Sequence, residues 1–237
     1  MTPTGSTAPA IAIDGLQFTY GSGPRVLDLP SLVIARGARV FVHGPSGCGK
    51  TTLLGILAGV LHATTGSVRV LDRDLVAMSG AQRDAFRAEH IGYVFQQFNL
   101  IPYLSAYDNI ALPCRLDARR RARLGNVSLN DAIHEVATQL DIVPLLHQPS
   151  TALSVGQQQR VAAARALLAA PELVICDEPT SSLDSDRRDA FLALLAASVA
   201  KASATLLFVS HDASLGARFD AQLSLPELNR AARQDAA

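Results

Sequence analysis

Residues 44–51 read GPSGCGKT and match the pattern G-x-x-x-x-G-K-[ST]. Glycines at these spacings let several backbone N–H groups point inward at one chain of phosphates, and a following helix presents its N-terminus to the same phosphates. The pattern predicts that Lys50 bridges the β- and γ-phosphates of a nucleotide, that the Thr51 hydroxyl binds Mg²⁺ and that Thr52 reaches the α-phosphate. The predicted phosphate-binding residues are Gly44, Pro45, Ser46, Gly47, Cys48, Gly49, Lys50, Thr51 and Thr52.

A pair of acidic residues, Asp177 and Glu178, follows the apolar run ELVIC at residues 172–176. A continuous apolar run is typical of a parallel strand that is buried on both faces. Carboxylates at the carboxyl end of such a strand would lie beside the phosphate-binding loop. Asp177 is therefore predicted to hold Mg²⁺ through water, and Glu178 to orient or deprotonate the water that attacks the γ-phosphate. The alternative is a pair of solvated loop acids, and the phosphate pattern in the same chain argues against it.

Strands and helices alternate around these two motifs, which predicts an α/β fold. Residues 39–43 read as a strand that enters the glycine-rich loop, and residues 50–61 read as the helix after it. Residues 172–176 and 205–209 are apolar strands separated by a helix at residues 185–202, which makes a βαβ unit. Further strands are predicted at residues 11–18, 31–34, 67–71, 91–95 and 222–225.

The middle of the chain differs, because no convincing strand is found between residues 105 and 170. Residues 130–140 have helical spacing, and residues 155–169 are rich in alanine with interspersed glutamine and arginine. An all-helical insertion in an α/β chain suggests a subdomain that moves relative to the core. The basic run RLDARRRAR at residues 115–123 is either a solvated face or a contact for an acidic partner or lipid head groups.

The composition is that of a globular protein whose 237 residues can bury a core without a disulfide or a metal. Hydrophobic residues make up 49% and charged residues 18%, and 21 basic residues balance 21 acidic ones, so no overall charge attracts nucleic acid. The apolar runs at residues 53–61 and 191–200 are shorter than the roughly 20 residues that span a bilayer. Residues 1–10 lack the features of a secretory signal and read as a disordered leader.

A further motif, LSVGQ at residues 153–157, gives these observations a common interpretation. Together with the phosphate pattern, with DEPTSSLD at residues 177–184 and with VSHD at 209–212, it resembles the nucleotide-binding subunits of ABC transporters over about residues 11–225. The resemblance implies a P-loop NTPase core with a mostly parallel sheet, an N-terminal antiparallel β subdomain and an α-helical subdomain that carries the LSVGQ signature. The implied divisions are an ABC ATPase domain at residues 11–225, its helical subdomain at about 97–170 and a C-terminal tail at 226–237.

The resemblance also implies an ATPase that uses ATP and Mg²⁺, and roles for residues outside the phosphate pattern. Tyr20 would stack on adenine, although taken alone it could equally be a packing residue. Gln96 would touch Mg²⁺ and the attacking water, so the implied metal-binding residues are Thr51, Gln96 and Asp177. His211 would contact the γ-phosphate and join Glu178 and Gln96 as the implied catalytic residues, although a lone histidine after a strand is usually structural.

The signature residues would act on a second subunit. Ser154, Gly156 and Gln157 would contact the ATP of the partner subunit, and Asp184 would couple the two sites, so the working form would be an ATP-bound homodimer. The chain would then power an integral-membrane permease from the cytoplasmic side, as a peripheral subunit on the inner face of the cell membrane.

The segment IGYVFQQFNLIPYLSAYDNIALP, at residues 91–113, resembles most the group of lipoprotein-releasing, macrolide-exporting and cell-division ATPases. Polar amino-acid importers share part of this segment, so an importer ATPase is the alternative. A soluble ABC ATPase acting on DNA or ribosomes is the rival from another class. Such proteins usually carry a long coiled coil or two cassettes in one chain, and this sequence has neither. The sequence therefore predicts no nucleic-acid partner, and it does not name the transported substrate.

Two features depart from the family pattern. Val155 stands in the signature where the family usually has glycine, and the hairpin with an Asp-Gly turn that usually closes the fold is missing. Ser154 is a natural N-cap, so we expect Val155 to be the first helical residue with an ordinary negative φ. A valine tolerates that conformation at a cost of a few tenths of a kcal/mol.

Overall fold

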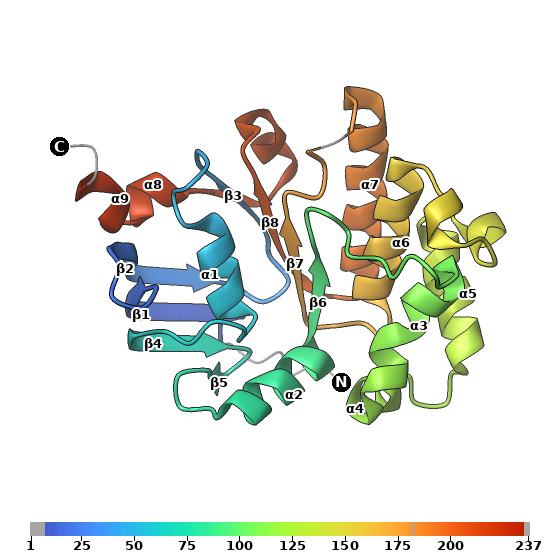
Figure 1. Cartoon of the computed structure of the whole chain (residues 1–237), viewed down its shortest axis with the longest axis horizontal. Coiled ribbons are helices and arrows are strands. Elements are labelled where there is room, and N and C mark those ends of the chain that lie inside the picture. The colour runs from blue at the N-terminus through green and yellow to red at the C-terminus, as the bar shows by residue number, and fades with distance from the viewer. Residues whose placement is uncertain (1–7, 182, 235–237) are drawn as a thin grey trace, which may run out of the picture.

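The computed structural model of the chain describes residues 8–181 and 183–234 (Figure 1). These residues form one parallel sheet, one antiparallel sheet and a helical lobe, which confirms the predicted α/β architecture. Of the predicted leader at residues 1–10, residues 1–7 lie outside the described part. Ala10 is fully buried, and its backbone bonds to Ile34 and Leu71, so the ordered fold begins before the first strand.

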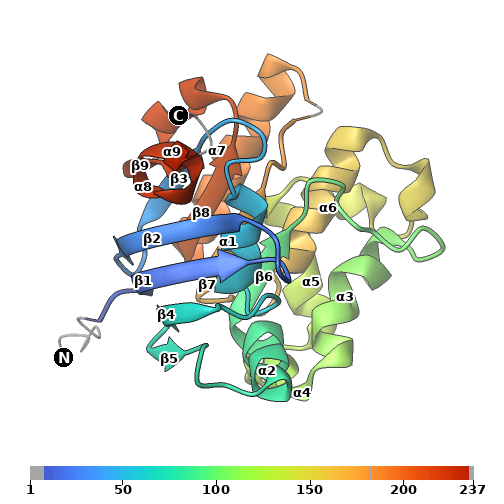
Figure 2. The ribbon, with the colours of Figure 1, turned by 60° about the vertical axis from the view of Figure 1, so that its left-hand side comes forward.

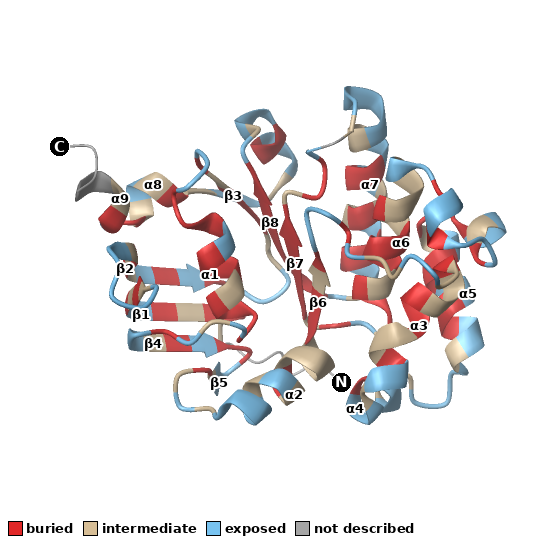
Figure 3. Ribbon diagram, viewed as in Figure 1, coloured by how far each residue is buried: buried red, intermediate tan, exposed pale blue. Residues whose placement is uncertain are grey.

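The parallel sheet has the strand order β6 (Ile91–Val94), β7 (Leu173–Asp177), β8 (Thr205–Ser210), β3 (Arg39–His43) and β9 (Ala221–Ser224) within the described residues. Every residue of β7 and β8 is buried (Figure 3). Successive side chains on a strand point to opposite faces. Accordingly, Val174 and Cys176 join the core on one side of the sheet, whereas Leu173 and Ile175 join the core on the other side. Both faces are covered, as the apolar run predicted.

The antiparallel sheet has the strand order β2 (Arg25–Ile34), β1 (Ile11–Thr19), β4 (Thr65–Val70) and β5 (Arg73–Asp74). In β1 buried and partly exposed residues alternate, because only one face packs on the core. Helix α1 (Lys50–Leu57) lies between this sheet and the parallel one (Figure 1).

Helix α1 is shorter than the sequence predicted, since it ends at Leu57 rather than at residue 61. Gly59 follows with φ of +70° and donates its N–H to the carbonyl of Ile56, which is the usual way for a glycine to end a helix. The next helix, α2 (Gly80–His90), begins with a capping box in which Ser79 and Gln82 bond each other's backbone N–H groups.

The helical lobe contains α3 (Ala106–Leu116), α4 (Ala118–Ala122), α5 (Leu129–Gln139) and α6 (Val155–Leu167) (Figure 1). Helix α7 (Ser185–Lys201) packs against α5 and α6 from the core side. Buried residues of the lobe, such as Ile110 and Val161, form one continuous cluster with Phe208 of the sheet. The lobe is therefore packed onto the sheet through a shared apolar core.

The segment after β8 differs from the prediction. Strand β9 ends at Ser224, parallel to β3, and Leu225 already begins a helix. Residues 226–234, which were expected to form a tail, make the short helices α8 (Leu225–Leu228) and α9 (Ala231–Gln234). Figure 2 shows both helices lying next to β2, and the N–H of Arg230 donates to the carbonyl of Asp28 in that strand. A strand that turns directly into a helix takes the place of the missing hairpin.

Two arginines of the basic run are structural rather than solvated. Arg120 is 1% exposed, and its guanidinium donates to the carbonyls of Ala166 and Leu168 at 2.9 Å and to the carbonyl of Glu89 at 3.2 Å. Burial lowers the pKa of Arg120 to about 10, so the guanidinium remains protonated at neutral pH. A cation at the carboxyl end of α6 satisfies carbonyls that the helix itself leaves unpaired.

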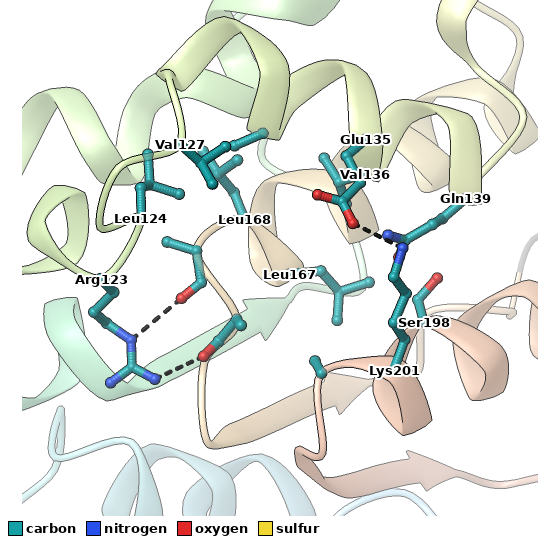
Figure 4. A pocket seen from close by; sticks show the side chains of 14 residues that line it. Arg123, Leu124, Val127, Glu135, Val136, Gln139, Leu167, Leu168, Ser198 and Lys201 are labelled. Carbon is teal, nitrogen blue, oxygen red and sulfur yellow. Dashed lines mark hydrogen bonds and ion pairs between the residues drawn. The ribbon is translucent and has the colours of Figure 1, made fainter.

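Arg123 lies at the same carboxyl end of α6 and binds further carbonyls there. Its guanidinium donates to the carbonyls of Ala169 and Ala170 and to the Glu172 carboxylate at 2.9 Å. Burial would raise the pKa of Glu172, but the hydrogen bond from His90 and the charge of Arg123 hold it below its usual value. Figure 4 shows Arg123 at one side of a pocket of about 270 Å³ between the lobe and the end of α7, with the Glu135–Lys201 ion pair at the other.

We expect Arg120→Ala to lower the free energy of unfolding by about 3 kcal/mol, because several buried carbonyls lose a charged donor. Arg121→Ala is the matched control in the same helix: Arg121 is exposed, so its loss should change the stability by less than about 0.5 kcal/mol. Urea denaturation measures both. Equal effects of the two substitutions would show that Arg120 does not hold the end of α6.

Candidate functional site

The loop at residues 44–49, called the phosphate loop below, joins the end of β3 to the start of α1. Gly47 and Gly49 have φ of +83° and +100°, a region that residues with a side chain rarely adopt. A cleft of about 290 Å³ opens over the loop. It is lined by Val26, Ser46, Gly47, Gly49, Lys50, Thr51, Thr52, Gln96 and Glu178. The structure thus brings the phosphate pattern, the glutamine after β6 and the second carboxylate into one cleft.

Lys50 is held at the floor of this cleft. Its ammonium donates to the carbonyls of Gly44 at 2.8 Å and Pro45 at 2.9 Å, and it lies 3.5 Å from Oε1 of Glu178. The Lys50 side chain is 6% exposed. The loop carbonyls therefore hold the positive charge of Lys50 in the cleft beside the Glu178 carboxylate.

Asp177 ends β7 and is 8% exposed. Burial raises the pKa of Asp177, and a hydrogen bond from the Thr51 hydroxyl opposes the rise. The Tyr93 hydroxyl lies within 3.5 Å of Oδ2 of Asp177, where it donates. Tyr93 was not predicted from the sequence. The signal was its position in β6, where it pairs with Ile175, two residues before Asp177 in the neighbouring strand β7. Asp177 and Thr51 offer carboxylate and hydroxyl oxygens, which are the ligands Mg²⁺ prefers.

Glu178 has φ of +45°, which is a strained value for a residue with a side chain. Its N–H donates to the carbonyl of Val209, so the kink after β7 is tied to β8. The carboxylate lies between Lys50 and His211, with 3.0 Å between its Oε2 and Nδ1 of His211. His211 follows the end of β8, and its side chain is 57% exposed.

Tyr20 lies at the rim of the cleft and is 53% exposed. Its hydroxyl is 3.1 Å from Oγ1 of Thr52, and the ring stands edge-on to Phe18 with 4.8 Å between the ring centres. One side of the ring is thus supported by the sheet, and the residue remains a candidate for stacking on a base.

The signature residues begin α6, on the helical lobe. Ser154 is the N-cap: its Oγ accepts the Gln157 N–H at 3.4 Å, and Oε1 of Gln157 accepts the Ser154 N–H at 2.8 Å. Val155 is the first helical residue and has no positive φ, which confirms the expected conformation. This capping box needs no glycine at position 155.

A second pocket, of about 270 Å³, opens beside the signature. It is lined by Ser154, Gly156, Gln157, Gln159, Arg160, Leu183, Arg187 and Phe191, and shares none of these residues with the first cleft. A Cβ on Gly156 would meet only Leu183, at 3.9 Å.

Asp184 is the N-cap of α7, where its Oδ1 accepts the Arg187 N–H at 2.9 Å. The buried Gln159 donates to the carbonyl of Pro179, directly after Glu178.

A phosphate loop on a parallel sheet, with a capped signature helix on a separate helical lobe, defines the class of ATP-binding cassettes. The ABC transporter family model matches residues 27–181. The chain therefore belongs to the ABC transporter family.

Individual relatives agree with this assignment. The lipoprotein-releasing system ATP-binding protein LolD of Syntrophotalea carbinolica is 37% identical over 216 residues, which cover 90% of this chain and 93% of that protein. A putative ABC transporter ATP-binding protein of Mycoplasma pneumoniae, the MG467 homolog, is 40% identical over 190 residues, which cover 80% of this chain. The chain spans 54% of the length of that Mycoplasma pneumoniae protein and 59% of its Mycoplasma genitalium counterpart.

A solved structure has the same fold. The dimeric structure of MJ0796, a bacterial ABC transporter cassette, superposes with a TM-score of 0.79 at 31% sequence identity and covers 91% of this chain and 94% of that chain. A second structure of MJ0796 is described as a post-hydrolysis state bound to ADP and Pi.

We expect Val155→Gly to change the ATPase rate by less than about threefold, which corresponds to roughly 0.65 kcal/mol in the activation free energy. The N-cap bond of Ser154 and the backbone N–H of Gly156 remain in place, because neither depends on the side chain at position 155. Steady-state phosphate release measures the effect. A large gain would show that valine weakens the signature of this chain and that the chain is adapted to a different partner cassette.

Proposed function

We propose that the chain is the ATP-binding and ATP-hydrolysing subunit of an ABC transporter of the export or lipoprotein-release type. It would power an integral-membrane permease by ATP-driven dimerisation. One observation carries the proposal: the phosphate cleft and the signature pocket are separate sites on one chain, and each holds part of the predicted nucleotide-binding set. The relatives named LolD support the export type.

The dimer follows from the separation of the two sites. Ser154 and Gly156 line a pocket that does not include Lys50 or Thr51, so one chain does not close its own site. A second copy would place its signature over the γ-phosphate held by the first. The dimeric structure of the related MJ0796 supports this arrangement.

Within the cleft, ATP would lie with its phosphates on the loop at residues 44–49 and its adenine on Tyr20. Mg²⁺ would be held by Thr51 and Gln96 and, through water, by Asp177, and it would neutralise charge on the phosphates. Lys50 would bridge the β- and γ-phosphates. The hydrogen bond from the Tyr93 hydroxyl to Asp177 supports a role for Tyr93 in orienting that carboxyl group.

Glu178 is the proposed base for water. In the structure its carboxylate lies between Lys50 and His211. A γ-phosphate placed between the same two groups would attract both, and the carboxylate would then be free to orient the attacking water. Loss of the γ-phosphate after hydrolysis would remove the group that bridges the two subunits, and the dimer would open.

A permease contact is proposed for the surface beside Gln96. A groove of about 130 Å³ there is lined by Gln97, Phe98, Leu100, Pro102, Ser150, Thr151 and Gln158, and the neighbouring Tyr103 is 82% exposed. The exposed aromatic ring beside this groove is the feature that supports a contact here. No helix in residues 8–181 and 183–234 is long and apolar enough to cross a bilayer. We propose that the chain lies at the inner face of the cell membrane, where the permease would hold it.

Glu178→Gln tests the ATPase mechanism. The variant should bind ATP and lose turnover by 10²-fold or more, which is the usual size of a general-base effect. Because opening requires hydrolysis, it should accumulate as an ATP-bound dimer, which size-exclusion chromatography with and without ATP detects. Turnover near the wild-type rate would remove Glu178 from this role.

Gly156→Ala tests the dimer. The added methyl group has space within the chain, so the melting temperature without nucleotide should stay within about 1 °C of wild type. The ATPase rate should fall at least tenfold, because the methyl group would point at the partner's γ-phosphate. Gly156→Asp should abolish activity, since it sets a carboxylate against a phosphate. Full activity of both variants would rule out a signature that acts on a second subunit.

The export assignment is tested separately by co-purification. The permease encoded beside this chain should have four spans and a large extracytoplasmic domain, and it should be retained by the tagged ATPase. A permease of the importer type in the same experiment would contradict the export assignment and leave the ATPase assignment intact.

A further inference from the structure

Asn229 contacts the phosphate loop but does not line the cleft over it. It is 1% exposed and follows α8, in the segment that was expected to be a tail. Its amide nitrogen donates to the carbonyl of Cys48 at 3.2 Å and to the carbonyl of Val26 at 2.9 Å. The side chain thus joins the phosphate loop to β2.

The amide oxygen of Asn229 also accepts two hydrogen bonds. It accepts the N–H of Asp28 at 2.8 Å and the N–H of Ala231 at 3.2 Å. Two N–H partners and two carbonyl partners allow only one orientation of the amide, because its oxygen only accepts and its nitrogen only donates. The side chain is therefore fixed at both ends.

The Cys48 carbonyl belongs to the same peptide unit as the N–H of Gly49. A trans peptide is planar, so its C=O and N–H point in opposite directions. Because the buried Asn229 holds the carbonyl, the N–H of Gly49 points away from Asn229, which does not line the cleft, whereas Gly49 does. A hydrogen bond at the carbonyl also polarises the peptide and strengthens the N–H as a donor.

The surroundings leave this peptide little freedom. A Cβ on Gly49 would lie 2.7 Å from Cδ2 of Leu27, and a Cβ on Gly44 would lie 2.9 Å from Cδ of Pro226 in α8. Glycine alone does not hold a peptide in one orientation, since it is the most flexible residue. The close approach of β2 and α8 and the bonds from Asn229 supply that restraint.

We infer that Asn229 is a positioning residue for phosphate binding, which acts through the Cys48–Gly49 peptide. Its effect is to hold the N–H of Gly49 ready for a phosphate oxygen before the nucleotide arrives. This inference rests on the assignment of the phosphate loop proposed above. It gives Asn229, the residue that follows α8, a function in nucleotide affinity.

The test compares three variants by calorimetric titration with Mg-ADP, which avoids hydrolysis and ATP-driven dimerisation. Asn229→Asp replaces the two donors with a carboxylate oxygen, and Asn229→Ser removes them without adding charge. Leu228→Ala is the matched control, because Leu228 packs on the same core from the same short helix and has no bond to the loop. All three variants should lower the melting temperature without nucleotide.

Only the two Asn229 variants should weaken Mg-ADP binding, by about tenfold, while Leu228→Ala should stay within twofold of wild type. The amide resonance of Gly49 provides a second measurement. Without nucleotide it should shift in Asn229→Ser and remain at the wild-type position in Leu228→Ala. Unchanged affinity in Asn229→Ser, or equal weakening in Leu228→Ala, would overturn the inference and leave the nucleotide site intact. A wild-type chain that does not bind Mg-ADP would instead overturn the proposed function, and the inference with it.

Discussion

The arrangement of the site depends on strands that are parallel and buried on both faces. Parallel strands end at the same edge of a sheet, so the loop after β3, the acidic pair after β7 and the histidine after β8 must meet there. The antiparallel sheet and the helical lobe cover this sheet from its two sides and add groups at the rim, Tyr20 from one and the signature from the other. The direction of the strands therefore determines which residues meet in the cleft.

Strained and polar residues are concentrated at this edge of the parallel sheet. Glu178 adopts a positive φ, Asp177 keeps a carboxylate in a buried position, and Lys50 binds backbone carbonyls of its own loop. The positive φ of Glu178 and the burial of the Asp177 carboxyl group each cost stability by themselves. Bonds to neighbouring strands hold both, from Glu178 to Val209 in β8 and from Tyr93 in β6 to Asp177. A site that is assembled in this way is ready for a charged ligand before the ligand arrives.

Local patterns were enough to predict the fold class and most of the residues that line the cleft. Gln96 was predicted from the family resemblance, and Val26 was not predicted. The phosphate pattern, the buried strand before Asp177 and the N-cap at Ser154 each act within a few neighbouring positions. Arg120 and Asn229 could not be predicted, because their partners are backbone carbonyls and N–H groups. The carbonyl partners of Arg120 lie 29 to 48 positions away, and the partners of Asn229 in β2 and the phosphate loop lie 181 to 203 positions away. A backbone carbonyl has no sequence signature, and a buried arginine within a basic run looks like its solvated neighbours.

The cap at the carboxyl end of α6 has a mechanical consequence. The helix has 13 residues, so Ser154 stands about 20 Å from the carbonyls that Arg120 and Arg123 hold. A tilt of about 10° about that end would carry Ser154 sideways by about 3.5 Å, which exceeds the range of a hydrogen bond. The two guanidinium groups and the apolar core that α6 shares with the sheet therefore both limit how far Ser154 can move.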